Sequence, residues 1–297
     1  CVDNDWIRIG TAQLSAAINP LGAELSSLRD GDGRELMTDA DPRFWTGRAP
    51  LLFPVVGRPY RDTIRIDGTP YPMKQHGFAR RRRFEVVEAT GTRAVFALHD
   101  DEETRASYPF AFRLEVAFAI AGATLSVTVT ITNPAATPLP ASFGFHPAFA
   151  WPLPYGRERG DHRILFDADE PGRLKEIAAD GTIAPREVDS PLDGRVLHLA
   201  DALFAHDALV WAPVHSSAVR YGVDGAPQLD IAFPDTPMLG VWTKPGAAFV
   251  CVEPWHGIAD PEGYEGDYRD KPGVFAIAPG GAKVIQLTVA LVHPQGA

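Results

Sequence analysis

The sequence predicts an all-β protein. Gly and Pro, 27 of each, make up about 18% of its 297 residues, against a usual share of about 12%. That abundance indicates many turns, while a hydrophobic fraction of 45% excludes a disordered chain. Apolar and polar residues alternate in many segments, as expected for half-buried strands. Helical periodicity is scarce, and we expect only a turn or two of helix near residues 201–204.

The clearest alternation lies in the neighbouring segments 112–120 and 125–131, in which every second residue is apolar. Ala121 and Gly122 separate them, which predicts a long hairpin with one buried and one polar face. A further long strand is expected at 284–291. Shorter strands are expected at 6–9, 63–66, 84–88, 94–98, 208–211, 218–222, 228–233, 239–243 and 249–253. About fifteen strands without a linker predict one large β-sandwich domain over residues 1–297, with two stacked sandwiches as the alternative.

Charge and cysteine content exclude several classes of protein. The net charge of −10 argues against a nucleic-acid partner, whose phosphates would be repelled. Cys1 and Cys251, the two cysteines of the sequence, cannot form a disulfide scaffold or a four-cysteine zinc site. An N-terminal Cys can mark a bacterial lipoprotein. Lipoproteins usually have a polar tether after that Cys, whereas strand-like sequence starts here at Trp6, which argues against this class. No apolar run approaches the roughly 18–20 residues of a membrane span, and nothing visible resembles a signal peptide. We therefore expect a cytoplasmic protein without a membrane partner.

Familiar cofactor and metal motifs are missing from the sequence. It contains no phosphate-binding glycine loop, no G-x-S-x-G and no H-E-x-x-H. Glu253 and His256 have the E-x-x-H spacing of helical di-iron sites, but Pro254 argues against a helix there. We therefore expect no metal. The run Arg80–Arg83 is either a solvated edge or an anion-binding rim beside His76.

Three segments place an ionisable residue among apolar, aromatic and glycine residues: 75–80 with His76, 142–149 with His146, and 252–257 with Glu253. A single His on an apolar face is commonly a core residue. Glu253 is harder to explain in that way, because it follows the apolar stretch 249–252 and a buried carboxylate needs partners. A half-buried carboxylate with a nearby His can act as general base and general acid.

In their order and spacing, these segments resemble the aldose 1-epimerase (galactose mutarotase) family, in its smaller bacterial branch. The resemblance also takes in residues 19–25, 49–58, 239–246 and 270–273, and so spans nearly the whole chain. It implies a large antiparallel β-supersandwich with few short helices. It also implies an isomerase that interconverts the α and β anomers of an aldose, with a sugar as its small-molecule partner and no cofactor.

The resemblance implies a role for individual residues. Glu253 matches the family's catalytic base, His146 its catalytic acid and His76 its second active-site histidine. Arg58 matches a sugar-binding arginine, and Asp207 an aspartate that holds sugar hydroxyls.

Trp242 and Trp255 offer faces on which a sugar can stack, and a core role is an equal alternative for each. Gly57 stands where larger family members often carry Asn, and the sugar-contacting glutamine of some members has no clear counterpart. The identity of the sugar is therefore left open.

Several functions remain to be weighed. The first is an aldose 1-epimerase acting on a free hexose. A hexose-6-phosphate 1-epimerase is the second, motivated by Arg58 and by Arg80–Arg83. The third is a non-catalytic carbohydrate-binding β-sandwich. A two-carboxylate glycosidase is disfavoured, because no pair stands out among the acidic residues of segment 260–270.

Overall fold

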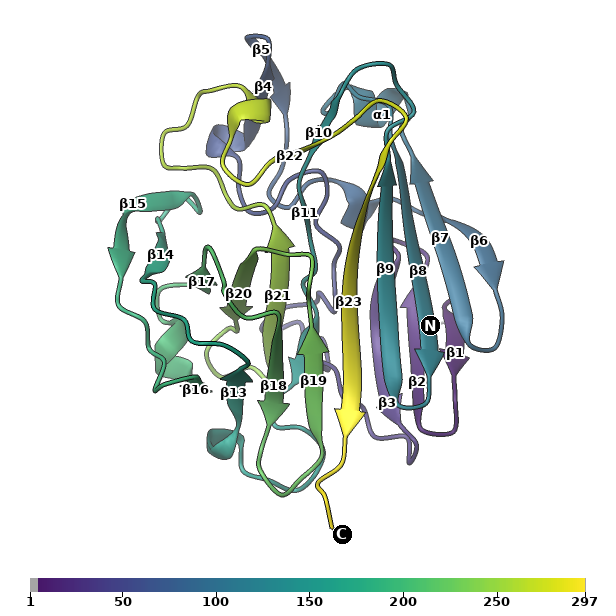
Figure 1. The fold of residues 1–297 in the computed structure, drawn as a ribbon, viewed down its shortest axis with the longest axis vertical. Coiled ribbons are helices and arrows are strands. Elements are labelled where there is room, and N and C mark those ends of the chain that lie inside the picture. Colours follow the sequence, from purple (N-terminus) through teal and green to yellow (C-terminus); the bar gives the residue numbers. More distant parts are fainter. Residues whose placement is uncertain (1–4, 297) are drawn as a thin grey trace.

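The protein is all-β, as predicted. The computed structural model describes residues 5–296, and Cys1 lies outside them. The described chain forms 23 strands, one α-helix of four residues, α1 (Glu102–Arg105), and five short 3-10 helices (Figure 1). The helical turn expected at 201–204 is one of these, Asp201–Phe204. None of the described helices is both long and apolar enough to cross a membrane.

One layer of the sandwich is a nine-stranded antiparallel sheet. The predicted hairpin forms two neighbouring strands at its centre, and the long C-terminal strand pairs with that hairpin. In spatial order the strands are β16 (Val196–His198), β13 (Arg163–Phe166), β18 (Ala218–Gly222), β19 (Gln228–Ala232), β23 (Ala282–Val292), β9 (Thr124–Thr132), β8 (Arg113–Ala121), β7 (Arg93–His99) and β6 (Glu85–Ala89).

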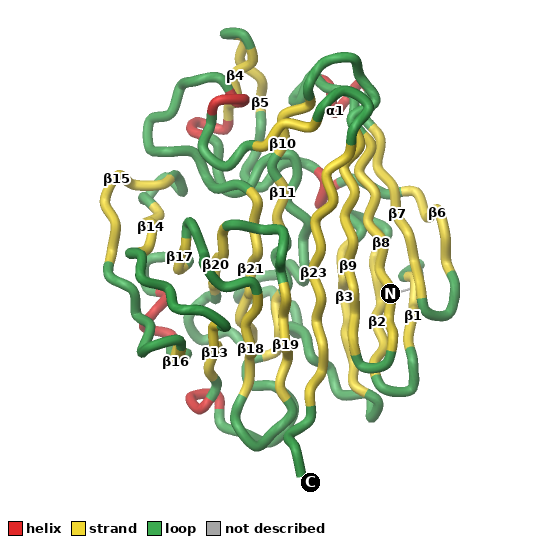
Figure 2. The backbone as a smooth tube through the Cα atoms, viewed as in Figure 1, coloured by secondary structure: helices red, strands yellow, loops and turns green. Residues whose placement is uncertain are grey.

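The opposite layer consists of two sheets that lie behind the first (Figures 1 and 2). One has three strands, β1 (Ile7–Gly10), β2 (Leu14–Asn19) and β3 (Glu24–Asp30). The other has the order β11 (Phe143–Gly144), β21 (Phe249–His256), β20 (Met238–Trp242), β17 (Leu209–Trp211), β14 (Leu174–Ile177) and β15 (Ile183–Val188), with β12 (Ala148–Ala150) also paired to β21. Two small two-stranded antiparallel sheets lie at one end of the molecule, β4 (Thr63–Ile66) with β5 (Thr69–Pro72), and β10 (Leu139–Ala141) with β22 (Phe275–Ile277).

Strand β21 separates the main core from the site. Successive side chains of a strand point to opposite faces. Val250 and Val252 accordingly pack in the large core between the layers. Cys251, Glu253 and Trp255 point to the other face, where the cavity lies.

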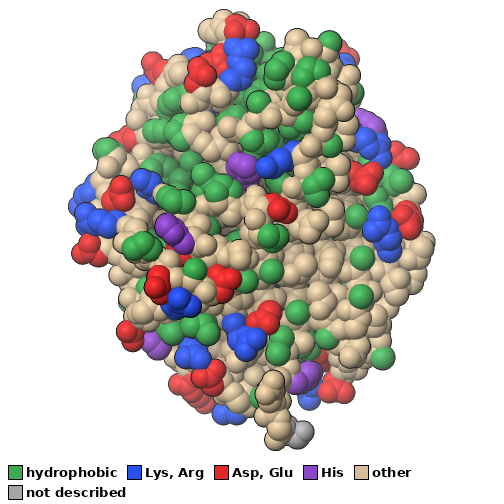
Figure 3. All heavy atoms as spheres, in the orientation of Figure 1, with side chains coloured by type: hydrophobic (Ala, Val, Ile, Leu, Met, Phe, Trp, Pro, Cys, Tyr) green, Lys and Arg blue, Asp and Glu red, His purple; other side chains and the backbone are tan. Residues whose placement is uncertain are grey.

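Charged side chains of both signs mix over the face shown in Figure 3, and few lie over β8, β9 and β23. This face shows no basic stripe of the kind that binds nucleic acid.

Candidate active site

A cavity of about 290 Å³ opens on the outer face of the seven-stranded sheet. Ligand sites usually span about 300–1,000 Å³, so this cavity suits one small ring rather than a chain. Its lining combines ionisable, aromatic and apolar side chains from segments far apart in the sequence: Trp45, Gly57, Gln75, His76, Arg80, His146, Ile177, Gly181, Ile183, Asp207, Ala208, Val210, Trp242, Lys244, Glu253, Trp255, Ile258 and Ala259.

His146 and Glu253 form a direct pair in this lining. The two-residue strand β11 and β12 both pair with β21, and the break between them holds His146 opposite Glu253. The Val252 N–H donates to the Pro147 carbonyl beside this break at 3.2 Å. His146 Nε2 lies 3.0 Å from Glu253 Oε1, and the residues are only 6% and 2% exposed. A buried carboxylate is costly unless it is paired, and His146 supplies the partner.

Aromatic rings surround His146. The Trp45 ring centroid lies 5.0 Å from that of His146, and the Trp242 ring lies 5.8 Å away, edge to face. Trp45 and Trp242 also meet edge to face at 5.3 Å. These distances fall in the favourable range for aromatic pairs, so the rings restrict how the imidazole can turn.

Trp255 adds a further indole to the lining, over two glycines. A Cβ atom at Gly240 or at Gly144 would come within 2.6 Å of the indole ring. Both positions therefore need glycine for the indole to occupy this place. The indole Nε1 of Trp255 is buried, and none of the described residues offers it a hydrogen-bond partner.

His76 is held by two reciprocal hydrogen bonds to Gly57. The His76 N–H donates to the Gly57 carbonyl at 2.9 Å, and the Gly57 N–H donates to His76 Nδ1 at 3.0 Å. His76 has a φ of 64°, which is strained for a residue with a side chain. Gly57 has a φ of 69°, and a Cβ there would lie 2.5 Å from the Ala259 Cβ. Glycine at position 57 is therefore required to hold the imidazole in this way.

The His76 ring is neutral and carries its proton on Nε2. Burial, together with the positive charges of His146, Arg80 and Arg81, holds the pKa of His76 well below its usual value. Since Nδ1 accepts from Gly57, the proton of the neutral ring resides on Nε2. The ring lies 5.6 Å from that of His146.

Arg80 brings a positive charge to the cavity. Burial, and secondly the charge of Arg81, lower the pKa of Arg80 to about 10, so the guanidinium remains charged at neutral pH. Its Nη2 donates to the Gln75 carbonyl at 3.2 Å, whereas its Nε is buried and has no hydrogen-bond partner within residues 5–296. Lys244 also lines the cavity and is exposed.

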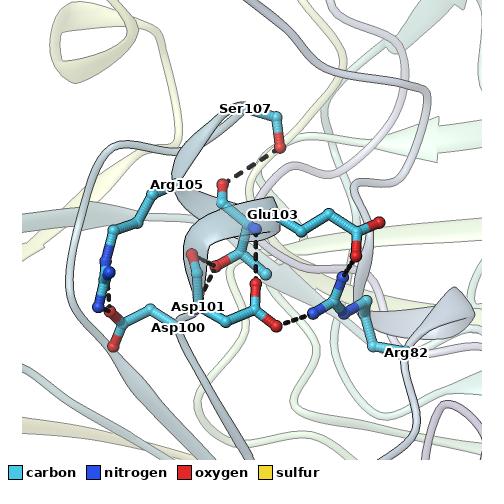
Figure 4. Close-up of polar contacts among 7 residues, drawn as sticks. Arg82, Asp100, Asp101, Glu103, Arg105 and Ser107 are labelled. Carbon is cyan, nitrogen blue, oxygen red and sulfur yellow. Dashed lines mark hydrogen bonds and ion pairs between the residues drawn. The ribbon is translucent and has the colours of Figure 1, made fainter.

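The other members of the arginine run have structural partners. Arg82 pairs with Asp101 and Glu103 at helix α1, the latter at 2.6 Å (Figure 4). Arg83 pairs with Asp5 at 2.5 Å. Of the two interpretations of the run, an anion-binding rim fits Arg80, and a paired edge fits Arg82 and Arg83.

The two expected sugar-binding residues differ in their placement. Asp207 lines the cavity just before β17, and its Oδ1 accepts from the Ala208 N–H at 2.7 Å. Arg58 adjoins the lining residue Gly181, but its guanidinium pairs with Asp62 at 3.1 Å and donates to the Asp180 carbonyl at 2.9 Å. It is not among the lining residues.

Glu253 and His256 do not converge. They lie on a strand, as the sequence indicated, with an odd spacing that sends their side chains to opposite faces. His256 packs on Phe275 with ring centroids 4.5 Å apart, and burial lowers its pKa to about 4.

Cys251 is fully buried, and burial together with Glu253 raises the pKa of its thiol well above the usual value, so it is no nucleophile.

The sequence interpretation missed parts of the lining. Trp45 lies in the irregular segment between β3 and β4, which shows no periodicity that could place it. Gln75 and Lys244 stand in segments that the resemblance covered, but neither was singled out. Ile177 and Ile183 come from β14 and β15, which were not predicted.

The fold and the site define a β-sandwich protein with a buried histidine–glutamate pair in the wall of a small cavity. A family model described as aldose 1-epimerase matches residues 5–262. The chain therefore belongs to the aldose 1-epimerase family, a family of sugar isomerases.

Known relatives cover almost the entire chain. Protein LacX of Lactococcus lactis subsp. lactis, in its chromosomal form, is 28% identical over 283 residues, which are 92% of this chain and 95% of LacX. A galactose mutarotase related enzyme from Lactobacillus acidophilus superposes with a TM-score of 0.90 at 29% identity, over 98% of this chain and 99% of that one. A galactose mutarotase-like protein from Lactobacillus casei gives 0.89 at 29% identity, over 97% and 100%. These structures confirm the predicted supersandwich.

Proposed function

We propose that the protein interconverts the α and β anomers of a hexose by opening and reclosing the sugar ring. The observation that carries the proposal is the contact between His146 Nε2 and Glu253 Oε1, 3.0 Å apart in a cavity sized for one ring. Membership of the aldose 1-epimerase family supports it.

The chemistry needs one base and one acid in close proximity. Glu253 takes the proton from the O1 hydroxyl, and protonated His146 gives a proton to the ring oxygen O5 as the C1–O5 bond breaks. Both oxygens are bonded to C1, so a base and an acid in direct contact can serve both. The C1–C2 bond of the open aldehyde rotates, and the same proton transfers in reverse close the ring on the other face. No metal or other cofactor is needed, and positioned acid–base groups typically contribute about 10²–10⁴-fold.

His76 supports this reaction as a neutral hydrogen-bond donor. Its Nδ1 accepts from Gly57, which leaves Nε2–H for a sugar oxygen. A fixed donor in a buried site stabilises charge that develops on such an oxygen. In this assignment His76 does not compete with His146 as the acid.

The remaining lining residues orient the sugar. Asp207 accepts from hydroxyl groups, and Trp242 provides an apolar face for the ring. Arg58 would have to leave Asp62 and the Asp180 carbonyl to reach a substrate, so Arg80 is the better placed arginine.

Polarimetry of freshly dissolved α-glucose and α-galactose tests the proposal. The optical rotation should approach its equilibrium value faster than in buffer, at a rate proportional to the protein concentration. If no aldose is equilibrated faster than in buffer, while binding is detected by calorimetry, the non-catalytic carbohydrate-binding alternative replaces the proposal.

A second candidate is a hexose-6-phosphate 1-epimerase. Arg80 favours it, because its charged side chain lines the same cavity as the exposed Lys244, and its Nε has no hydrogen-bond partner in the part of the chain that the structure describes. The test compares kcat/KM for glucose and glucose 6-phosphate in the wild type and in Arg80→Ala, with Arg83→Ala as the control outside the cavity. A preference for the phosphate that Arg80→Ala alone removes would establish this substrate class. Clear preference for the free sugar would exclude it.

A further inference from the structure

Cys251 lies beside the proposed acid–base pair and has no part in the reaction described above. It shares one face of β21 with Glu253, two residues further along. One ligand atom each from the His146 imidazole, the Cys251 thiol and the Glu253 carboxylate lie within 4.8 Å of one another. These residues are 6%, 0% and 2% exposed. Among the described residues, they form the one group of three or more His, Cys, Asp or Glu with metal-ligand spacing.

The three donors match the preferences of Zn²⁺. Zinc binds thiolate sulfur at about 2.3 Å and imidazole nitrogen or carboxylate oxygen at about 2.0–2.2 Å, in tetrahedral geometry. In such a site the ligand atoms lie roughly 3.3–3.8 Å apart. The group therefore needs only small side-chain movements to surround one ion, because its atoms already lie within 4.8 Å and the nitrogen–oxygen pair is at 3.0 Å.

The surroundings provide access and charge balance. His146 and Glu253 line the cavity, so an ion can enter from that side and keep a water molecule in its fourth position. The Glu253 carboxylate and the Cys251 thiolate together neutralise a divalent cation, which limits the cost of burying it. When the ion binds, the Cys251 thiol loses its proton, and the protonated His146 loses the proton on Nε2, the nitrogen that becomes a ligand. Both protons pass to the buffer.

The imidazole of His146 sets the strength of the site. A metal-bound histidine usually donates its second ring N–H to a partner, and loss of such a partner costs about 10–100-fold in metal affinity. His146 Nδ1 is buried without a hydrogen-bond partner among the described residues. This arrangement favours reversible binding over a permanently held ion.

We propose that His146, Cys251 and Glu253 form a reversible site for Zn²⁺, and that the bound ion inhibits the enzyme by occupying its acid and base. The binding rests on the geometry alone, whereas the inhibition rests on the proposed function.

Cobalt substitution tests the binding without any activity measurement. The 297-residue protein is titrated with Co²⁺ in a Cys1→Ser background, so that Cys251 supplies the only thiol of this sequence. We expect a thiolate-to-cobalt charge-transfer absorption that saturates at one ion per chain and is displaced by Zn²⁺. Cys251→Ser and Cys251→Ala should abolish it. His198→Ala should retain it, because that exposed histidine lies outside the group of three and pairs with Asp193 at 3.7 Å. Absence of the absorption in the Cys1→Ser protein would overturn the site, as would its persistence in both Cys251 variants.

Polarimetry then tests the inhibition. We expect Zn²⁺ to inhibit the wild type, EDTA to restore the rate, and Cys251→Ser to keep its activity with at least tenfold lower sensitivity to Zn²⁺. Equal sensitivity of the wild type and Cys251→Ser would contradict inhibition through this site. If the protein accelerates no anomerisation, the proposed function fails, and the cobalt titration still decides whether the metal site exists.

Discussion

A buried ion pair beside the cavity offers a sharp test of the structure. Lys271 Nζ lies 2.9 Å from Asp260 Oδ1, and each residue is only 3% exposed. Asp260 Oδ2 accepts from the Tyr60 N–H at 2.7 Å. The backbone of Asp260 also bonds to two segments next to the cavity: its N–H donates to the carbonyl of Arg58, which follows the lining residue Gly57, and its carbonyl accepts from the N–H of the lining residue Ile183.

Lys271→Met should destabilise the protein strongly, because it leaves the Asp260 carboxylate buried with a single hydrogen-bond donor. Breaking a buried pair by removing one partner costs about 3–5 kcal/mol. For a chain of this length that corresponds to a fall in Tm of about 5–8 °C. Urea denaturation followed by circular dichroism measures the free energy of unfolding. Loss of the ion pair should also lower kcat/KM, because Asp260 is bonded to segments next to the cavity.

Two variants control the interpretation. Asp260→Asn combined with Lys271→Met removes both charges and keeps an acceptor for Tyr60, so it should be more stable than Lys271→Met alone. Lys175→Met removes a partly exposed partner of Glu187, with the charged atoms 3.2 Å apart, and should cost less than about 1 kcal/mol. If Lys271→Met cost no more than Lys175→Met, or if the double variant were the least stable, the buried pair would not act as described.

Three further changes have defined outcomes. Gly57→Ala should lower the free energy of unfolding by about 2–4 kcal/mol, because the backbone of residue 57 is left-handed and the new Cβ would clash with Ala259. It should also reduce kcat/KM, and wild-type values in thermal and kinetic assays would contradict this. His256, with a pKa of about 4, stays neutral in the folded protein while the unfolded chain binds a proton below about pH 6.5, so stability should fall as pH drops from 6.5 to 4, by at most about 3 kcal/mol. Urea midpoints at several pH values should therefore show a shallower slope for His256→Phe than for the wild type, and parallel slopes would count against the assignment. His76→Ala should lower kcat about 10²-fold or more through loss of the Nε2–H donor, whereas His76→Gln, which keeps a donor, should lose less; equal losses would argue against that role.

Strands with strict alternation could be located from the sequence. The segments 112–120, 125–131 and 284–291 became β8, β9 and β23, because each buries one face against the core and leaves the other to solvent. Strands β3 and β10 to β12 gave no such signal. Strand β3 is buried along most of its length despite containing Ser26 and Ser27, and β10 to β12 have only two or three residues each.

The candidate site was predictable where a side chain conflicted with its surroundings. Glu253 after an apolar strand and His146 in an aromatic segment drew attention for that reason, and the structure brings them into contact. Trp45 gave no comparable signal, because an aromatic residue in an irregular segment is ordinary in sequence. The position of the Arg58 guanidinium depends on Asp62 and on the carbonyl of Asp180. Asp180 lies 122 residues from Arg58 in the sequence, and no local pattern reveals a contact over that separation.

The rate of mutarotation of Glu253→Gln tests the central claim most directly. Gln keeps the size of the side chain and a hydrogen-bond acceptor for His146 but cannot take the O1 proton. Initial rates with freshly dissolved α-glucose and α-galactose should fall about 10²–10⁴-fold relative to the wild type, with the circular dichroism spectrum and Tm showing a folded protein. Equal rates for the folded variant and the wild type would contradict the role of Glu253 as the base.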